Sequence, residues 1–327
     1  MKSGLSPFGL ISSAGFCLAF PFAAQAAMFP DGAFSRKAAG SVGAAFLKSP
    51  PGARSMGMAE VAAGGAEGAE AVFFNPAGLA RRPAPALSEA GIGYNNLLEG
   101  AHSGALAYAA PLGKGALGLG FVYFSQSEQT AYNALGDSAG SFSAGDMALS
   151  AAYAGALGRL LLGGGAKVIR SSIDNVSGSA VAFDFGAQFL RLTEAGDGPV
   201  DVGCSVFNLG SPLKLGQESD PLPFHIRTGV LWHTTPYLKT AFDYNLPVDN
   251  DPYLTMGLEG HVPLQRPKPW KALFRGGYNL RYSRKVEGLS GLALGAGLDF
   301  ERFFIDYAWV PFGDIGSTNR FWLGYRF

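Results

Sequence analysis

The residues that could carry chemistry are single acids and bases set into apolar segments. Nine of them fall on the polar side of alternating patterns, namely Asp146, Lys167, Asp184, Lys239, Asp243, Glu259, Arg275, Asp299 and Asp306. Charges held inside a protein are usually paired, because burying a lone charge is costly. We therefore interpret these residues as an interior network in which Asp and Glu meet Lys and Arg.

The residues that usually act as metal ligands or nucleophiles are poorly placed for either role. His102, His225, His233 and His261 are scattered and lack metal-ligand spacing, and none lies in a recognisable nucleophile motif. Cys204 is the only cysteine outside the first segment of the chain, which holds Cys17. No disulfide framework or cysteine metal cluster can form within one mature chain. We expect no catalytic site, metal or cofactor.

The elements that position the charges alternate with a period of two. In AVAFDFGAQF, residues 180–189, Val181, Phe183 and Phe185 share one face, and Asp184 and Gln188 share the other. This alternation is typical of strands with one apolar and one polar face. About fourteen such segments start near Leu87, Leu106, Leu117, Asp146, Leu162, Val181, Val200, Ile226, Leu238, Leu254, Trp270, Leu292, Phe303 and Arg320.

The composition of the two faces decides between a soluble sandwich and a membrane barrel. The chain has 327 residues and is 48% hydrophobic and 15% charged, with 47 glycines and no net charge. In a soluble sandwich, the polar face would meet bulk water and carry many Lys, Glu and Thr residues. Here it is Gly and Ala with sparse charges, which suits a narrow lumen, while Phe, Leu, Tyr and Trp suit lipid. We expect an all-β fold, a transmembrane antiparallel β-barrel of about 14 strands over residues 86–327, and no nucleic-acid partner.

The connections between the segments agree with a barrel in the outer membrane of a bacterium. Short links at 111–114, 156–159 and 234–236 alternate with longer ones at 126–143 and 208–223. Outer-membrane barrels have short periplasmic turns and longer external loops. Outer-membrane lipid is therefore an expected partner.

Residues 1–26 have the three-part pattern of a secretory signal peptide. Lys2 precedes an apolar stretch from Leu10 to Phe22, and Ala24 and Ala26 fit the small-residue cleavage site. A membrane anchor is the alternative, but the stretch is short and Pro21 interrupts it. We expect the mature protein to leave the cytoplasm.

Residues 27–85, which precede the strands, contain the stretch AVFFNPAGLA at 71–80. Asn75, Pro76, Ala77 and Gly78 predict a compact turn, with Pro76 fixing one dihedral and Gly78 allowing a positive φ. Because the flanking residues are apolar, we expect the turn to be buried. The enclosure available is the barrel interior, so this segment is expected to form a hatch that plugs the lumen.

Several stretches resemble the PorV/PorQ family, within the wider FadL-like group of outer-membrane proteins. They are KSPPGARSMGMAEVA and FFNPAGLA near the start, then FSAGDMALSAAYA, AFDFGAQF, FNLGSPLKLG, PLPFHIRTGVLW and DYAWVPFGDIGSTNRFWLGYRF. The resemblance implies a fourteen-stranded barrel with an inward hatch. Family members include transporters of hydrophobic compounds and components of type IX secretion that hold cargo at the cell surface. Ala59 and Glu60, and residues 64–67, depart from the family pattern.

Two function hypotheses follow. In the first, a hydrophobic or amphipathic small molecule passes through the lumen, and inward aromatics such as Phe124 and Trp322 line a pocket. In the second, the barrel anchors a docking platform of a type IX-like secretion system, and the loops at 126–143 and 208–223 bind a secreted protein. A third hypothesis, a barrel lipase, requires a Ser close to a His and is disfavoured.

Overall fold

The computed structural model describes residues 29–81, 87–196, 198–265, 269–282 and 288–327. The predicted signal peptide, residues 1–26, lies outside the described residues, and so do residues 82–85 of the predicted hatch. Among the described residues, no helix is long and apolar enough to cross a membrane.

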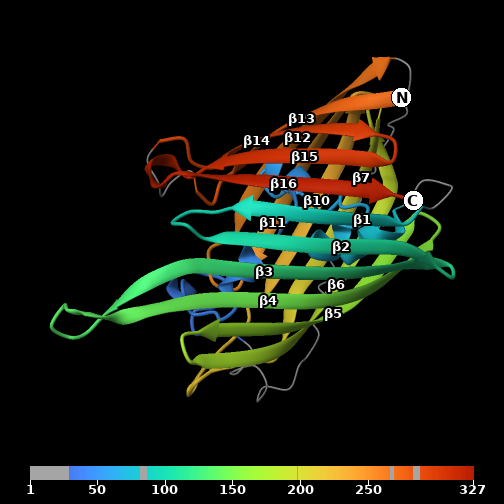
Figure 1. Cartoon of the computed structure of the whole chain (residues 1–327). Coiled ribbons are helices and arrows are strands. Elements are labelled where there is room, and N and C mark those ends of the chain that lie inside the picture. The colour runs from blue at the N-terminus through green and yellow to red at the C-terminus, as the bar shows by residue number, and fades with distance from the viewer. Residues whose placement is uncertain (1–28, 82–86, 197, 266–268, 283–287) are drawn as a thin grey trace, which may run out of the picture.

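Fourteen antiparallel strands close into a barrel, in which the first strand pairs with the last (Figure 1). The strands are β1 (Glu89–Asn96), β2 (His102–Leu112), β3 (Gly115–Tyr132), β4 (Ser138–Leu157), β5 (Leu160–Ile173), β6 (Val176–Ala195), β7 (Gly198–Gly210), β10 (His225–Thr235), β11 (Leu238–Pro247), β12 (Tyr253–Gln265), β13 (Pro269–Asn279), β14 (Leu292–Phe300), β15 (Phe303–Pro311) and β16 (Ser317–Arg326). This confirms the predicted fold class and strand number.

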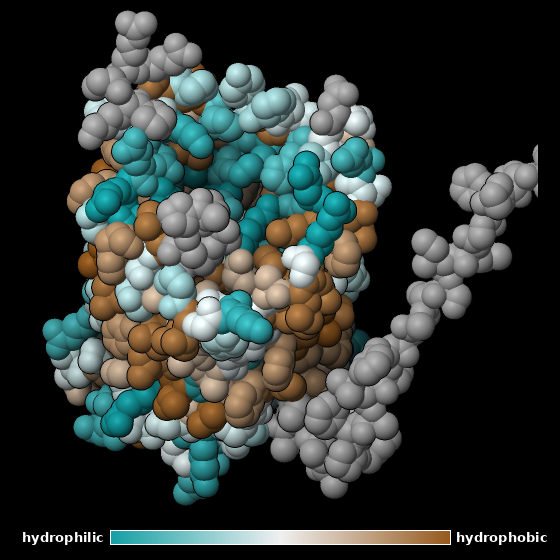
Figure 2. Space-filling model, turned by 90° about the vertical axis from the view of Figure 1, so that its right-hand side faces the viewer, coloured by the Kyte–Doolittle hydropathy of each residue, from teal (hydrophilic) through white to brown (hydrophobic). Residues whose placement is uncertain are grey.

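The two faces of the barrel wall differ as the alternation predicted. In β6, Phe183 and Phe185 are 48% and 49% exposed, whereas Asp184 and Gln188 are 5% and 1% exposed. Large apolar side chains therefore cover the outside, and the charges face inward. Figure 2, which views the molecule from the side on the right in Figure 1, shows hydrophobic residues on the wall and hydrophilic residues around a hollow.

The connections divide the barrel into a short-turn end and a long-loop end. Turns at 113–114, 158–159, 236–237 and 301–302 lie at the short-turn end, beside the chain terminus at Phe327. At the other end, β3 and β4 continue past the rest of the wall as a two-stranded hairpin (Figure 1). Most of the predicted loop at 126–143 is therefore strand. Pairing between β3 and β4 continues through it, although apolar and polar side chains no longer alternate there.

The second predicted loop, 208–223, folds back toward the lumen. It contains a small sheet of β8 (Leu213–Leu215) and β9 (Glu218–Asp220). Leu213 and Leu222 are buried in a cluster with Ile169, and the Gly43 N–H donates to the Pro221 carbonyl at 2.9 Å. This loop covers the lumen at the long-loop end.

The residues before β1 pass through the barrel. Residues 29–41 lie at the long-loop end, where Arg36 pairs with the exposed Asp251, and residues 42–81, which we call the inner segment, are largely buried against the wall. Their short helices are η1 (Arg36–Ala38), η2 (Ala45–Lys48), α2 (Ala53–Gly57), α3 (Ala71–Phe74) and η3 (Pro76–Ala80), and η4 (Gly313–Ile315) lies between β15 and β16.

Candidate functional site

The Asn75 side chain joins the inner segment to two strands of the wall. Asn75 is fully buried, and its Nδ2 donates to the carbonyl oxygens of Ala63 at 2.8 Å, Cys204 at 3.2 Å and Ala187 at 3.3 Å. Its Oδ1 accepts from the Ala77 N–H at 3.1 Å, so Asn75 caps η3. Buried carbonyls need such donors, because water is excluded from them.

Glycines on three neighbouring strands make room for this turn. A Cβ added to Gly186 of β6 would overlap Asn75 Oδ1, and one added to Gly203 of β7 would overlap the Ala63 carbonyl. At Gly163 of β5, a Cβ would lie 2.5 Å from the Ala77 nitrogen. We call Gly163, Gly186 and Gly203 the first glycine seat. Glycine permits this close approach because it has no side chain.

The expected positive φ at Gly78 is wrong. Gly78 lies within the 3-10 helix η3 and is absent from the positive-φ residues. A Cβ at Gly78 would instead overlap the Ala66 carbonyl, so close approach of the backbone is the reason for glycine.

A second glycine seat holds the end of α2. Cβ atoms added to Gly257 of β12 and Gly277 of β13 would lie 2.7 Å from Met58 Cβ and 2.5 Å from its carbonyl carbon. One added to Gly295 of β14 would come within 3.0 Å of the Gly57 Cα. The inner segment therefore rests on two separate arcs of the wall, β5 to β7 and β12 to β14, with β10 and β11 between them.

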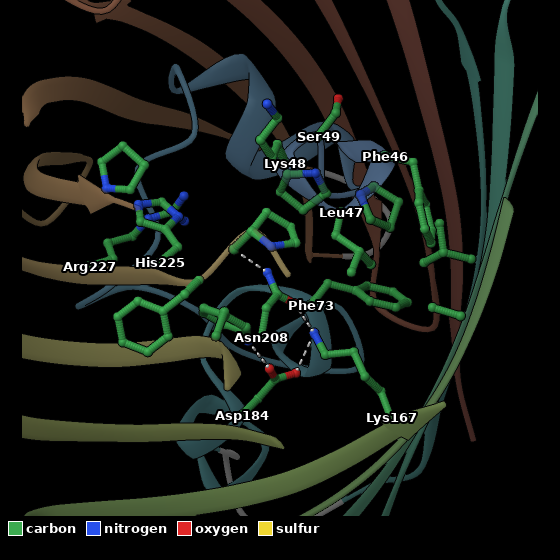
Figure 3. A pocket seen from close by; sticks show the side chains of 18 of the residues that line it. Phe46, Leu47, Lys48, Ser49, Phe73, Lys167, Asp184, Asn208, His225 and Arg227 are labelled. Atoms are coloured by element: carbon green, nitrogen blue, oxygen red, sulfur yellow. Dashed lines mark hydrogen bonds and ion pairs between the residues drawn. The ribbon is translucent and has the colours of Figure 1, made fainter. Parts of the chain in front are cut away.

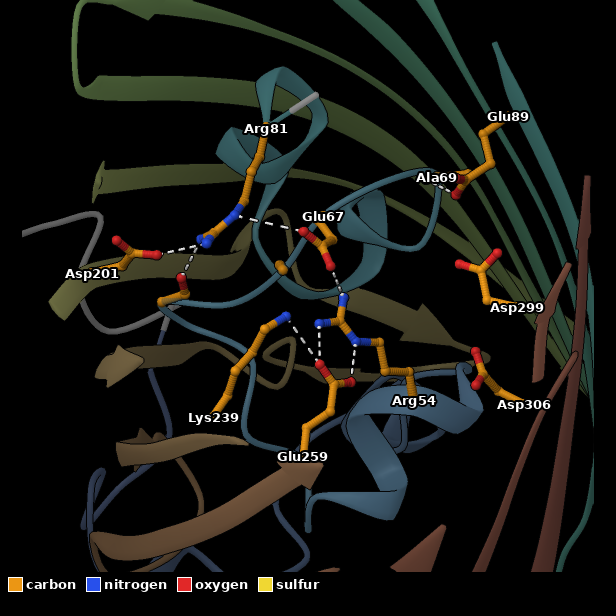
Figure 4. Close-up of polar contacts among 12 residues, drawn as sticks. Arg54, Glu67, Ala69, Arg81, Glu89, Asp201, Lys239, Glu259, Asp299 and Asp306 are labelled. Carbon is orange, nitrogen blue, oxygen red and sulfur yellow. Dashed lines mark hydrogen bonds and ion pairs between the residues drawn. The ribbon is translucent and has the colours of Figure 1, made fainter. Parts of the chain in front are cut away.

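Arg54 links the inner segment to a cluster of wall charges (Figure 4). Its Nε and Nη2 donate to the two oxygens of Glu259 at 2.8 and 3.0 Å, and its Nη1 donates to Glu67 at 2.5 Å. Glu259 also accepts from Lys239 at 3.1 Å and from Arg275 at 2.9 Å. A bidentate guanidinium and carboxylate pair is a strong, directional contact.

The network continues along the wall and the inner segment. Arg275 donates to Asp306 at 2.6 Å, and Arg81 donates to Asp201 at 2.5 Å. Burial raises the pKa of Glu67, but the charges of Arg54, Lys239 and Arg81 lower it to about 2. Glu67 therefore stays ionised between the two arginines.

The structure brings together some of the nine predicted residues and separates others. Lys239, Glu259, Arg275 and Asp306 form one cluster, while Lys167 pairs with Asp184 at 2.8 Å in another. The remaining three have other partners or positions. Asp243 accepts from the Ala62 and Ala63 N–H groups at 2.8 and 2.9 Å, Asp299 pairs with Arg326, and Asp146 is half-buried in β4.

Sequence reasoning missed the partners that come from the inner segment and the wall, which are Arg54, Glu67, Arg81 and Asp201. Arg54 and Glu67 are charges within a stretch of small residues, and that contrast could have indicated them. Asp201 is set in VDVGCSVF, on the face opposite Val202 and Cys204.

Two cavities lie on opposite sides of the inner segment. The short-turn cavity has a volume of about 660 Å³ and is lined by the charge network, including Arg54, Glu259 and Arg326. The long-loop cavity is smaller, about 70 Å³, and is lined by Phe46, Phe73, Lys167 and Arg227 among others (Figure 3).

Helix α3 separates the two cavities. Its residues Val72 and Phe73 line the long-loop cavity, and Ala71 and Phe74 line the short-turn cavity. The helix has only four residues and packs against η3, β3 and β4.

The aromatic residues expected to line a pocket take other positions. Trp322 is 1% exposed and packs over Gly91 and Gly93, where an added Cβ would lie 2.4 and 2.6 Å, respectively, from the nearest ring atom. Its ring meets Phe73 edge-on at 6.5 Å. Neither Trp322 nor Phe124 lines either of these two cavities. Phe73 faces the long-loop cavity in their place.

Comparisons with known proteins concern the fold. No family model and no curated protein matches this chain. Among solved structures, the chain is similar to the Pseudomonas putida toluene transporter TodX, with a TM-score of 0.58 and 11% identity, covering 83% of this chain and 96% of that chain. The Ralstonia pickettii toluene transporter TbuX gives 0.59 and 14%, covering 84% and 98%. The CymD monoaromatic hydrocarbon channel gives 0.54 and 13%, covering 85% and 97%.

These similarities define the class to which the fold belongs. At such low identities they show the architecture alone, a closed antiparallel barrel like that of these transporters and channels.

Proposed function

We propose that this chain is a bacterial outer-membrane barrel through which hydrophobic or amphipathic small molecules pass. The observation that carries the proposal is the pair of cavities on the two sides of α3, within a barrel that has the fold of hydrocarbon channels. A molecule entering at the long-loop end would reach Val72 and Phe73 first. Displacement of α3 would then admit it to the short-turn cavity, which corresponds to the periplasmic side in outer-membrane barrels.

In this passage, the charge network would keep the inner segment attached to the wall while α3 moves. It fixes the inner segment to the wall through Arg54 and Arg81, on either side of the α3 turn in sequence. The ion pairs hold the segment at positions 54 and 81, whereas the turn at 71–74 is held mainly by apolar contacts. Apolar contacts are not directional, so this turn can shift without breaking an ion pair.

Uptake into vesicles tests the proposal. Vesicles with a lipopolysaccharide outer leaflet, with and without the barrel, are exposed to radiolabelled toluene. We expect faster uptake with the barrel, and faster still with Phe73→Ala, which enlarges the passage at α3. Phe183→Ala on the lipid-facing side of β6 is the matched control and should behave as the wild type. Equal uptake in empty and barrel-containing vesicles, for toluene and for the amphipathic probe 2-phenylethanol alike, would exclude the function.

A second candidate function, docking of a secreted protein, would use the projecting hairpin of β3 and β4. At its tip, Tyr132 and Leu135 are 68% and 87% exposed. The motifs at the start of the chain support a place in the PorV/PorQ family, whose members include docking components. Removing residues 127–142 should abolish surface retention of a cargo protein while leaving toluene uptake unchanged. Retention of cargo by the shortened barrel would count against docking through this hairpin.

We also propose that the chain is not an enzyme. Glu259 is engaged by Arg275 and Asp243 by a backbone N–H group, so neither carboxylate is free to act as a nucleophile or a base. Steady hydrolysis of a phospholipid or ester by the pure protein would overturn this.

A further inference from the structure

A row of aromatic side chains follows the lipid-facing wall at the short-turn end of the barrel. The ring centres of Phe303 and Tyr325 are 4.5 Å apart. The ring of Phe327 lies 5.7 Å from that of Tyr325 and 6.2 Å from that of Tyr108. In outer-membrane barrels, aromatic side chains gather where the hydrocarbon meets the lipid head groups. The row therefore marks the level of the head groups at this end.

Four exposed basic side chains lie in or near the turns at the same end. They come from the turns after β2, β4 and β14 and from the last part of β6, and we call them the basic rim: Lys114, Arg159, Arg302 and Arg191. Each lies within two positions of a large apolar side chain that is more than half exposed, and these are Leu112, Leu157, Phe303 and Leu192. The basic rim therefore borders the apolar wall, and at Arg302 it adjoins the aromatic row.

The charges of the basic rim are not neutralised within the chain. In the part of the chain that the structure describes, none of the four side chains pairs with a carboxylate. Arg159 Nη1 donates to the carbonyl oxygen of Arg191 at 3.2 Å, which brings these two positions together. Among the described residues, the exposed acidic side chains at this end are Glu194 and Glu301, so basic side chains are in excess.

The long-loop end carries the opposite charge. Over the described ranges, its exposed acidic side chains outnumber its exposed basic ones and include Glu99, Glu128, Asp137, Asp174 and Glu218. The whole sequence has no net charge. The excess of exposed positive charge is thus a property of the short-turn end and not of the surface as a whole.

Lysine and arginine are suited to phosphate groups at a membrane surface. A guanidinium can donate two parallel hydrogen bonds to a phosphate, and an ammonium attracts it as a point charge. Their long stems lie along apolar surface while the charge reaches the head groups. Short turns of outer-membrane barrels face the periplasm, so the lipids beside the basic rim are the phospholipids of the inner leaflet.

We propose that the basic rim binds the phosphate groups of anionic phospholipids in the inner leaflet, so that these lipids collect around the periplasmic end of the barrel. The stems of the rim residues lie along the neighbouring apolar side chains, and the acyl chains cover the wall next to them. This inference concerns the outside of the barrel and does not depend on what passes through the lumen.

The composition of the lipid shell tests the inference. The full barrel is placed in phosphatidylcholine bilayers that contain a trace of spin-labelled phosphatidylglycerol or of phosphatidylcholine labelled at the same acyl position. Electron spin resonance gives the fraction of each probe held at the protein surface. We expect phosphatidylglycerol to associate at least about twofold more strongly, because basic residues near the head groups attract anionic lipid. At 1 M salt the preference should fall toward none, since the screening length there is about 3 Å.

Two variants with the same change of net charge locate the preference. The rim variant removes three cations near neighbouring turns, by Lys114→Gln, Arg159→Gln and Arg191→Gln. The control removes three exposed cations at the long-loop end, by Lys37→Gln, Arg170→Gln and Lys214→Gln. We expect the rim variant to lose most of the preference and the control to keep it. Heat-dependent gel mobility verifies that each variant is folded.

Three outcomes would overturn the inference. The first is equal association of the two probes with the wild type at low salt. The second is a preference for phosphatidylglycerol that persists in the rim variant. The third is an equal loss in the rim variant and the control, which would make net charge and not the basic rim the cause.

Discussion

Asn75 shows how one side chain can determine the position of a whole segment. Three backbone carbonyls, from Ala63, Ala187 and Cys204, depend on its amide nitrogen, and two of them belong to the wall. The same side chain caps η3 through its oxygen. The inner segment and the wall are thus joined by an amide that can donate and accept at once.

Replacing Asn75 with Asp separates these two roles. The acceptor for the Ala77 N–H is kept, but the three carbonyls lose their donor and face a carboxylate. We expect the attachment of the inner segment to weaken by on the order of 1 to 3 kcal/mol. Protease cleavage within residues 42–81 should become faster, while the heat-dependent gel mobility of the barrel is unchanged.

Asn133→Asp provides the control for this experiment. Asn133 lies at the exposed tip of the hairpin, where its Oδ1 accepts from the Leu135 and Asp137 N–H groups. An aspartate can make the same contacts there, so cleavage should match the wild type. If Asn75→Asp is also cleaved at the wild-type rate, its amide does not hold the segment.

At the scale of the strands, the face assignment leads to a test at Cys204 in β7. Cys204 is half-buried and lies between Val202 and Val206 on the outward face, while Gly203 and Ser205 face inward. We expect a membrane-soluble maleimide to label Cys204 in liposomes, and a charged maleimide to leave it unmodified because the site lies against lipid.

A shifted cysteine gives the matched comparison. In Cys204→Ser with Ser205→Cys, the thiol moves to a position that is 1% exposed and faces the inner segment. Neither reagent should label it rapidly. Rapid labelling of Cys204 itself by the charged reagent would mean that the register of β7 differs by one residue, since a slip of one reverses both faces.

The strands could be predicted from the sequence because alternation is a local property. Each apolar side chain, such as Phe183, needs only its own strand and the lipid to determine its direction. The hairpin of β3 and β4 was not predicted as strand because both of its faces meet water, which removes the alternation. The inward fold of residues 208–223 depends on contacts such as Leu213 with Gly43, far apart in sequence.

The cavities and the charge network were harder to predict, because they also depend on contacts between residues that are far apart in the sequence. The charges of Glu259 and Arg275 could be assigned to the lumen from the pattern, but Arg54, which also donates to Glu259, is about 200 positions away in the sequence. Trp322 was correctly placed on the inner side but not against Gly91 and Gly93, because that contact depends on closure between β1 and β16.

At the scale of the whole molecule, the wall and the inner segment are separable. The wall is closed by backbone hydrogen bonds between neighbouring strands, including β1 with β16, and these do not involve residues 42–81. We therefore expect a barrel lacking residues 43–80 to keep its heat-dependent gel mobility. Its buried charges would be hydrated by the opened lumen, and single-channel conductance in planar bilayers should rise well above that of the intact protein.

Shortening the hairpin supplies the control for the deletion. Removal of residues 127–142 takes away a shorter piece of chain that lies outside the lumen, so conductance should stay low. If conductance also stays low after residues 43–80 are removed, the inner segment is not what blocks the lumen.

The two glycine seats limit which substitutions the protein can accept during evolution. Along β6, an exchange of one large apolar residue for another at Phe183 or Phe185 alters only a surface in contact with fluid lipid. At Gly186, by contrast, a single methyl group would collide with Asn75. We therefore expect tolerated substitutions to alternate along the same strand. Lipid-facing residues should vary, and the inward-facing glycines should stay almost unchanged. Lineages of this protein would retain their seat glycines long after the lipid-facing residues between them had become unrecognisable.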